Sequence, residues 1–156
     1  MRSLFIVILL LCSFGLYSQE VTVASYSVSE GLIQSQVKAL TQDHRGNIWV
    51  GTKGGVSIFN GDDFINIGYD QLQKGIVLDI EEDQDSNVWI ATLNGLAKYD
   101  YSGVEAFPLD SLALNSITID KEGTIWLSTW NRRGAKAGLY QFDGRMNDGN
   151  LEKKLQ

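Results

Sequence analysis

Residues 43–55 read D-H-R-G-N-I-W-V-G-T-K-G-G, a polar turn followed by a short apolar strand and a glycine turn. The same pattern returns in residues 83–95 as D-Q-D-S-N-V-W-I-A-T-L-N-G, and from residue 120 as D-K-E-G-T-I-W-L-S-T-W. Trp49, Trp89 and Trp126 hold the same place in the three copies and are 40 and 37 residues apart. A period of this size is typical of repeat architectures.

Each copy predicts an antiparallel meander of short strands, because runs of apolar and β-branched residues alternate with Gly, Asn and Asp turns. No window shows a competing helical period. Strands that are apolar on both faces need cover on both sides, which stacked four-stranded sheets of this period supply in β-propellers. The predicted strands are residues 36–42, 47–52, 56–60 and 64–68, then 76–80, 87–92, 96–99 and 104–107, and finally 116–120, 124–129 and 138–142.

The predicted fold class is therefore all-β, with about three propeller blades over about residues 26–68, 69–107 and 112–144. The third copy lacks its outer strand, so we expect an incomplete propeller. Residues 21–28, V-T-V-A-S-Y-S-V, predict one more strand that has no partner in the first copy. In a closed ring such a strand commonly completes the last blade.

The two ends of the chain differ from the repeats. Residues 1–18 combine Arg2 with an apolar run and predict a signal peptide cleaved after Ser18, with a lipoprotein at Cys12 left open. We then expect the blades to fill residues 19–144 of a periplasmic or secreted protein without a membrane span after cleavage. Residues 145–156 are polar and are expected to be a disordered tail.

The composition excludes several classes of partner and chemistry. The chain has 156 residues, is 44% hydrophobic and carries a net charge of −6, which argues against nucleic acid as a partner. Its single cysteine lies in the leader, so the mature chain has no disulfide, no thiol chemistry and no cysteine metal site. We predict no cofactor.

The residues that recur are expected to be structural. A short carboxylate that opens a turn accepts hydrogen bonds from later backbone N–H groups, and tryptophans that repeat in phase behave as core positions between sheets. The predicted structural positions are Asp43, Trp49, Thr52, Asp83, Trp89, Thr92, Asp120, Trp126 and Thr129.

Catalytic and metal signals are weak. Asp83, Asp85 and Asn87 imitate the start of a calcium loop, but its twelfth position is Asn94 instead of glutamate, so no metal site is predicted. His44 is the only histidine and is assigned no role, and the acidic run from Glu81 is interpreted as a solvated edge. No nucleophile elbow or phosphate-binding glycine loop is present.

The insertion W-N-R-R-G-A-K-A, which begins at Trp130, is the one place where a copy departs strongly from its siblings. Insertions in repeat proteins map to loops, often on the binding face. Trp130 offers a stacking surface, and Arg132 and Arg133 offer planar forks that suit carboxylates or sulfates. These three residues form the predicted ligand site, with an incidental surface loop as the alternative.

The motif resembles the two-component regulator propeller repeat. The first copy carries E-G-L at residues 30–32, then D-x-x-G-N-I-W-V-G-T over 43–52, G-G-V over 54–56 and F-x-G over 59–61. The later copies depart at Ser86, Ala91, Thr124 and Ser128. The resemblance implies the periplasmic sensing part of bacterial hybrid sensor kinases, whose ligands are commonly oligosaccharides. No kinase domain follows in this chain.

The sequence therefore leaves two hypotheses about function. The first is an extracytoplasmic propeller segment, a truncated product without enzyme activity, that binds an oligosaccharide, another small ligand, further blades or its own copies. The alternative is a lyase similar to the streptogramin lyases, which share the D-x-x-G-x-I-W core and depend on histidine and magnesium at the propeller centre. One histidine in a turn disfavours this alternative.

Overall fold

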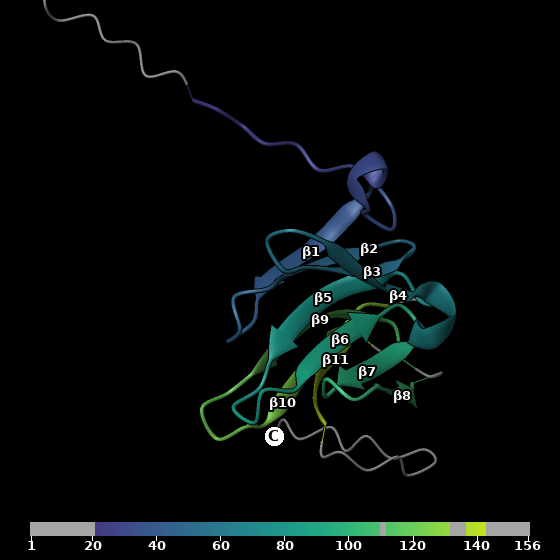
Figure 1. Cartoon of the computed structure of the whole chain (residues 1–156). Coiled ribbons are helices and arrows are strands. Elements are labelled where there is room, and N and C mark those ends of the chain that lie inside the picture. Colours follow the sequence, from purple (N-terminus) through teal and green to yellow (C-terminus); the bar gives the residue numbers. More distant parts are fainter. Residues whose placement is uncertain (1–20, 110–111, 132–136, 143–156) are drawn as a thin grey trace, which may run out of the picture.

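The computed structural model describes residues 21–109, 112–131 and 137–142. Within these ranges the strands form three antiparallel sheets, in the orders β1-β2-β3-β4, β5-β6-β7-β8 and β11-β10-β9 (Figure 1). Blade 1 consists of β1 (Val37–Gln42), β2 (Ile48–Thr52), β3 (Gly55–Phe59) and β4 (Phe64–Gly68). Blade 2 consists of β5 (Val77–Glu82), β6 (Val88–Thr92), β7 (Gly95–Tyr99) and β8 (Val104–Pro108). Blade 3 consists of β9 (Leu114–Ile119), β10 (Ile125–Thr129) and β11 (Gly138–Phe142).

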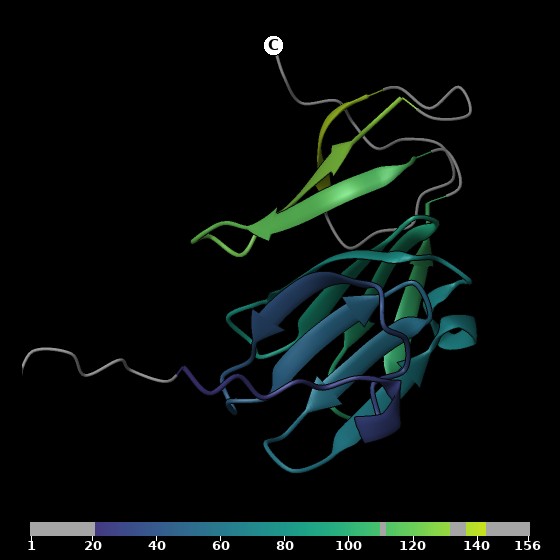
Figure 2. The same ribbon diagram turned by 90° about the horizontal axis from the view of Figure 1, so that it is seen from above.

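This architecture confirms the predicted all-β class of consecutive propeller blades. The first strands β1, β5 and β9 lie next to one another in successive sheets, so the blades follow one another around a common inner edge (Figures 1 and 2). Blade 3 has three strands in the described part of the chain, as expected for an incomplete propeller.

The alternation of side chains along each strand decides which blade it contacts. On β6, Val88 and Ile90 point into the core shared with blade 1, whereas Trp89 and Ala91 point into the core shared with blade 3. A strand with period two therefore joins two interfaces at once. Each core is apolar: the first includes Trp49, Val56, Ile58, Leu72, Val77 and Ile80, and the second includes Leu96, Phe107, Leu114, Ile117, Leu127 and Phe142.

The second residue after the tryptophan differs between the three copies, and packing explains the glycine in the first copy. Gly51 lies in the contact between blades 1 and 2, where an added Cβ would lie 2.5 Å from a methyl carbon of Val77. The two sheets approach too closely there for any side chain. The equivalent positions in the next blades hold Ala91 and Ser128 and therefore do not share this constraint.

The strand predicted at residues 21–28 is wrong. Residues 21–27 have no regular structure, and Val28–Glu30 form a short 3₁₀ helix (η1). The Ser27 hydroxyl accepts the Ser29 N–H at 3.3 Å and the Glu30 carboxylate accepts the Ser27 N–H at 2.6 Å, which closes a capping box. A strand needs a neighbour for its backbone hydrogen bonds, and no described strand pairs with this segment. A second 3₁₀ helix, η2 (Tyr69–Leu72), precedes blade 2.

The predicted signal peptide and the polar tail lie outside the described residues. None of the helices in the described ranges has the length and apolar character that crossing a bilayer requires.

The Leu72 side chain is fully buried in the core between blades 1 and 2. Its substitution tests how much this core contributes to the free energy of unfolding. Leu72→Ala should lower the free energy of unfolding by about 2–5 kcal/mol, because it removes buried methyl groups and leaves a cavity. Ile65→Ala, at an exposed position on β4, is the matched control and should change it by less than about 0.5 kcal/mol. Urea unfolding of both variants measures this, and equal losses would contradict the packing described.

Candidate functional site

Each blade has a turn built on one carboxylate. In all three copies the indole N–H donates to the second carboxylate oxygen at 2.8 Å, from Trp49 to Asp43, from Trp89 to Asp83 and from Trp126 to Asp120. The first oxygen accepts backbone N–H groups two and four residues later, at 2.8–3.1 Å. The carboxylate thus fixes the turn and the tryptophan together.

Hydrogen bonding keeps these carboxylates ionised. Burial alone would raise the pKa of Asp43, but hydrogen bonds from Trp49, Asn47 and Tyr101 outweigh it and lower the pKa to about 2. The pKa of Asp83 is also lowered, because bonds from Asn87 and Trp89 outweigh the effect of burial. Donors to the charged form of a carboxyl group favour that form. Both oxygens of Asp83 are therefore engaged by the turn itself, which gives the calcium-like spacing a structural explanation.

The junction of blades 1 and 2 is tied by polar and aromatic side chains. Tyr101, at φ 66°, donates its hydroxyl to Asp43 Oδ2 at 2.8 Å, and burial followed by this bond raises the pKa of the phenol. The Arg45 guanidinium lies 3.6 Å from the centre of the Tyr101 ring, a cation–π contact. A turn of blade 1 is therefore held by a turn of blade 2.

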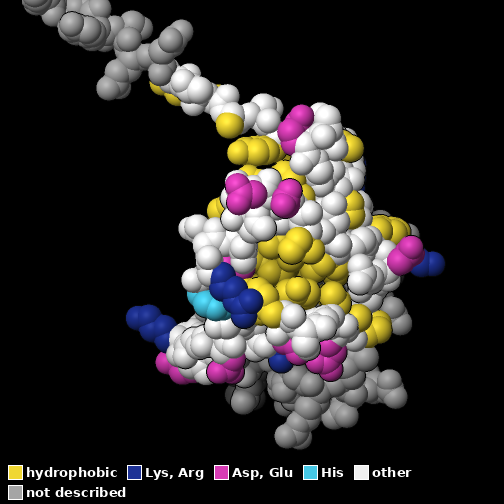
Figure 3. All heavy atoms as spheres, in the orientation of Figure 1, with side chains coloured by type: hydrophobic (Ala, Val, Ile, Leu, Met, Phe, Trp, Pro, Cys, Tyr) yellow, Lys and Arg dark blue, Asp and Glu magenta, His cyan; other side chains and the backbone are white. Residues whose placement is uncertain are grey.

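His44 belongs to the same junction, so the assignment of no role to it is wrong. Its backbone N–H donates to Glu82 Oε2 at 2.7 Å, and its Nδ1 lies 2.6 Å from Glu82 Oε1. Glu82 is accordingly a partner of the neighbouring blade and not a purely solvated edge. Figure 3 shows the histidine on the surface beside a Lys or Arg side chain and next to a hydrophobic area. No local pattern predicts this pair, because the two residues are 38 positions apart in the sequence.

The junction of blades 2 and 3 uses other groups at related places. Gln84, which holds the place of His44, donates its side-chain amide to the Lys121 carbonyl at 2.6 Å. Asp79 accepts the Ile117 backbone N–H at 3.0 Å. In blades 1 and 2 the residue after the turn aspartate therefore contacts the next blade, but the chemistry of the link differs between the two junctions.

The recurring threonines close the hairpin that follows the tryptophan strand. Their hydroxyls donate to a carbonyl across the turn, from Thr52 to Gly55 at 2.8 Å, from Thr92 to Gly95 at 3.0 Å and from Thr129 to Gly138 at 3.3 Å. The third hairpin thus keeps the same closing bond although it carries the insertion.

The three tryptophans are not equally buried. Trp49 and Trp89 are buried between blades, whereas Trp126 is half-buried. Trp126 is therefore less buried than the predicted core position between sheets, since no further sheet in the described ranges packs on its side of β10.

Trp130 follows the end of β10 and is half exposed. Its indole N–H donates to the Leu114 carbonyl at 3.0 Å, and its backbone N–H donates to the Ala113 carbonyl at 3.1 Å. The ring is held at its indole nitrogen, while about half of the residue stays accessible to solvent. The other two predicted ligand residues, Arg132 and Arg133, lie outside the described residues.

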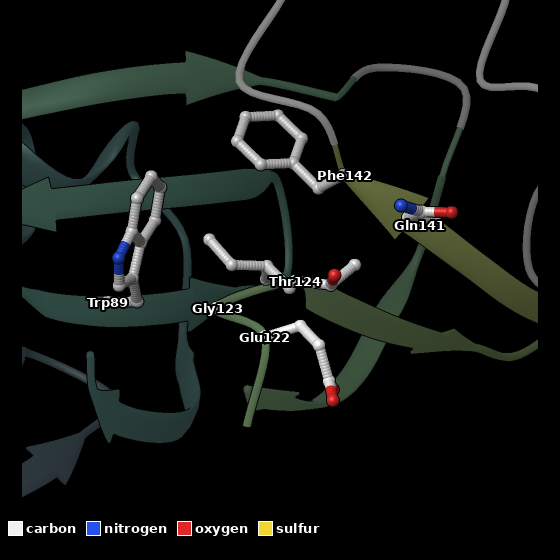
Figure 4. Close-up of a pocket in the computed structure, with 7 residues that line it drawn as sticks. Trp89, Glu122, Gly123, Thr124, Gln141 and Phe142 are labelled. Atoms are coloured by element: carbon white, nitrogen blue, oxygen red, sulfur yellow. The ribbon is translucent and has the colours of Figure 1, made fainter. Parts of the chain in front are cut away.

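A shallow hollow of about 340 Å³ lies at the opposite end of β10 (Figure 4). Trp89 and Phe142 form an aromatic wall, with ring centres 5.8 Å apart, and Glu122, Thr124 and Gln141 supply polar groups. Such a mixture can bind a flat polar molecule. Sequence reasoning did not find this hollow, because its residues come from two different blades.

Consecutive antiparallel sheets with a shared inner edge and the same aspartate turn define a segment of a β-propeller. The family model of the two-component regulator propeller matches residues 31–54, which confirms the resemblance seen in the sequence. No curated protein matches the chain.

Solved structures share the fold. The extracellular domain assigned to the hybrid two-component system BT4673 of B. thetaiotaomicron matches with a TM-score of 0.66 and 21% identity, over 86% of this chain and 19% of that one. The corresponding domain of BT3049 matches with 0.61 and 22%, over 81% and 19%. Virginiamycin B lyase of Staphylococcus aureus matches with 0.55 and 19%, over 70% and 42%. The chain thus spans about a fifth of the length of the two extracellular domains.

The Asp43 turn gives a stability test. Asp43→Asn should lower the free energy of unfolding by about 2 kcal/mol at neutral pH, because Trp49 and Tyr101 lose a charged acceptor. Asp62→Asn, at an exposed loop carboxylate, is the control and should have little effect.

The same variant has a pH signature. The pKa of Asp43 is about 2 in the folded chain and takes its ordinary value of 3.8 in the unfolded chain, so the unfolded state binds more protons between these values. The contribution of this group to stability is present above pH 4 and is lost as the pH falls towards 2. Asp43→Asn should flatten that part of the stability curve in chemical unfolding. An unchanged acid slope would show that Asp43 does not carry it.

Proposed function

We propose that this chain is an extracytoplasmic segment of a sensor-type propeller, which binds a small ligand and further propeller blades and is not an enzyme. The observation that supports this proposal best is the match of all three blades to the extracellular domains of two-component systems. Those structures are described as extracellular domains, which supports a location outside the cytoplasm for this segment. Because the matched structures are several times longer than this chain, ligand recognition is proposed only for the surfaces it carries.

The proposed ligand surface is Trp130 with Arg132 and Arg133, which follow it in the sequence. The Trp130 ring is pre-oriented by its bond to Leu114, so little conformational freedom is lost when a ligand stacks on this half-exposed side chain. Arginine forks bind carboxylates and sulfates in a bidentate manner. We therefore propose an oligosaccharide with acidic groups as the ligand class.

The lyase alternative has a weaker basis. The fold likeness to virginiamycin B lyase supports a propeller but no shared chemistry at 19% identity. His44, the only histidine of the sequence, uses Nδ1 and its backbone N–H to hold Glu82 at a junction between blades. A residue engaged in this way serves the scaffold, which favours the binding function.

Trp130→Ala tests the proposed ligand surface. Titration calorimetry with a heparin-derived sulfated tetrasaccharide, and with the same tetrasaccharide after desulfation, should show tighter binding of the sulfated form. Trp130→Ala and the double variant Arg132→Gln/Arg133→Gln should each weaken that binding by about tenfold or more, the expected effect of losing one good contact of about 1.4 kcal/mol. Trp130→Phe keeps a ring and should retain most of the affinity.

Two controls locate the site. Gln141→Ala removes a polar group from the hollow at the other end of β10 and should leave tetrasaccharide binding unchanged. All variants should melt within a few degrees of the wild type. Loss of binding in Gln141→Ala but not in Trp130→Ala would move the ligand site to the hollow, and loss in neither would reject both surfaces.

A further inference from the structure

The phenol of Tyr101 occupies a defined place in the junction between blades 1 and 2. Its hydroxyl donates to Asp43 Oδ2 at 2.8 Å, and its ring centre lies 5.3 Å from that of Tyr99. Tyr99 in turn lies edge-on to Trp49, with ring centres 5.3 Å apart at 66°. The Arg45 guanidinium covers the Tyr101 ring. The phenol therefore combines an aromatic neighbour, a turn carboxylate and a cation.

Strand register identifies the counterpart of Tyr99 in the next junction. Tyr99 pairs with the first residue of β6, and Phe142 pairs with the first residue of β10. Phe142 also lies edge-on to Trp89, with ring centres 5.8 Å apart at 69°, close to the angle between Tyr99 and Trp49. The aromatic pair of the first junction is therefore repeated between blades 2 and 3.

The phenol itself is not repeated. The position two residues after Phe142, which corresponds to Tyr101, is Gly144 in the sequence. The hollow of about 340 Å³ adjoins Phe142, as the Tyr101 phenol adjoins Tyr99, and the turn residues from Glu122 to Thr124 line it as well (Figure 4). A hollow thus lies at the second junction beside the ring whose counterpart borders a phenol at the first.

The turn carboxylates of the two junctions differ in the same way. Asp43 Oδ2 accepts three side-chain donors: an amide and an indole of its own blade, and the Tyr101 hydroxyl of the next blade. Asp83 Oδ2 accepts the corresponding amide and indole, but no hydroxyl from a described residue of blade 3. Asp43 is 4% exposed, whereas Asp83 is only partly buried. Asp43 shows that this oxygen can accept a third donor, so Asp83 Oδ2 can take one from a ligand.

The charged groups of the two places differ in sign. Asp85 holds the turn position of Arg45, and Glu122 is the only charged side chain among the described residues that line the hollow. Two cations are close to these groups: Lys98 Nζ lies 5.8 Å from the centre of the indole ring of the hollow, and Lys121 precedes Glu122 in the turn. Because the carboxylate lines the hollow itself, it favours a cationic ligand over an anionic one.

We infer that the hollow between blades 2 and 3 binds a phenol that carries an amine group, in the place that the Tyr101 side chain fills between blades 1 and 2. The hydroxyl donates to Asp83 Oδ2, the ring packs against Phe142, and the amine lies near Glu122. The volume is at the lower end of the range of small-molecule pockets, which suits one ring with a short side chain. This site and its ligand class are separate from the surface proposed at Trp130.

Tyramine, which has a phenol hydroxyl and a primary amine, is the probe. The isotope-labelled chain is titrated with tyramine, and its four indole N–H signals are followed by heteronuclear NMR. The Trp89 signal should shift with a Kd of about 1 mM or tighter, because its indole N–H and the ligand hydroxyl share Asp83 Oδ2. Trp130→Ala should leave this Kd unchanged.

Two matched ligands test the two polar contacts. Phenethylamine lacks the hydroxyl and should bind about tenfold more weakly, the effect of losing one hydrogen bond to a charged acceptor. The compound para-hydroxyphenylpropanoate has a carboxylate in place of the amine and should bind about threefold more weakly or worse, because Glu122 repels it. Glu122→Gln should narrow the difference between the two phenols. Asp62→Asn, at an exposed carboxylate of blade 1, should not.

Tyr101→Gly tests the comparison between the two junctions. Glycine suits the positive φ of 66° at this position and removes the phenol. The variant should gain a second tyramine site beside Asp43, seen as a shift of the Trp49 indole signal. The preference for the amine over the acid should shrink or reverse there, because Arg45 replaces Asp85. If this variant does not fold, the titrations of the natural chain decide by themselves.

Three results would overturn the inference. An unmoved Trp89 signal at about 10 mM tyramine would show that the hollow binds no such ligand. Equal Kd values for tyramine and phenethylamine would show that the hydroxyl finds no acceptor. A shift of the Trp130 signal alone, lost in Trp130→Ala, would place tyramine on the other surface. Binding of the sulfated tetrasaccharide is measured separately, so the proposed function can fail or succeed independently of this site.

Discussion

The bond between a turn aspartate and the indole N–H of a tryptophan six residues later holds each blade together. The carboxylate also accepts two backbone N–H groups of its own turn, so one side chain fixes the turn and orients the ring. The low pKa of Asp43 means that these bonds are made to a charged acceptor, which makes them stronger than neutral ones. In blades 1 and 2 the same tryptophan also packs on the next sheet, so local turn geometry and blade packing depend there on a single acceptor.

The blades share this frame but are linked in different ways. Blades 1 and 2 are joined by His44 with Glu82 and by Tyr101 with Asp43, whereas blades 2 and 3 use Gln84 with the Lys121 carbonyl. The apolar rows provide most of the contact between sheets, since burial of apolar area is the dominant favourable term. The polar links are therefore free to vary in type while they keep the blades in register.

The proposed ligand surface lies apart from the apolar cores that join the blades. Trp130 and the hollow beside Trp89 lie at the two ends of β10, on the rim of the sheets. A ligand on the rim would contact loops, whose sequence can change without disturbing the cores.

The sequence by itself determined the repeat, the strands of the three blades and the all-β propeller class, because turn residues and alternating apolar residues are local signals. Only the tertiary structure decided the roles of His44, Glu82 and Tyr101, since each acts on a residue of another blade. It also decided that residues 21–27 form no strand and that Trp126 is less buried than Trp49. Both outcomes depend on whether a neighbouring sheet is present, and a local pattern cannot encode the presence of a neighbour.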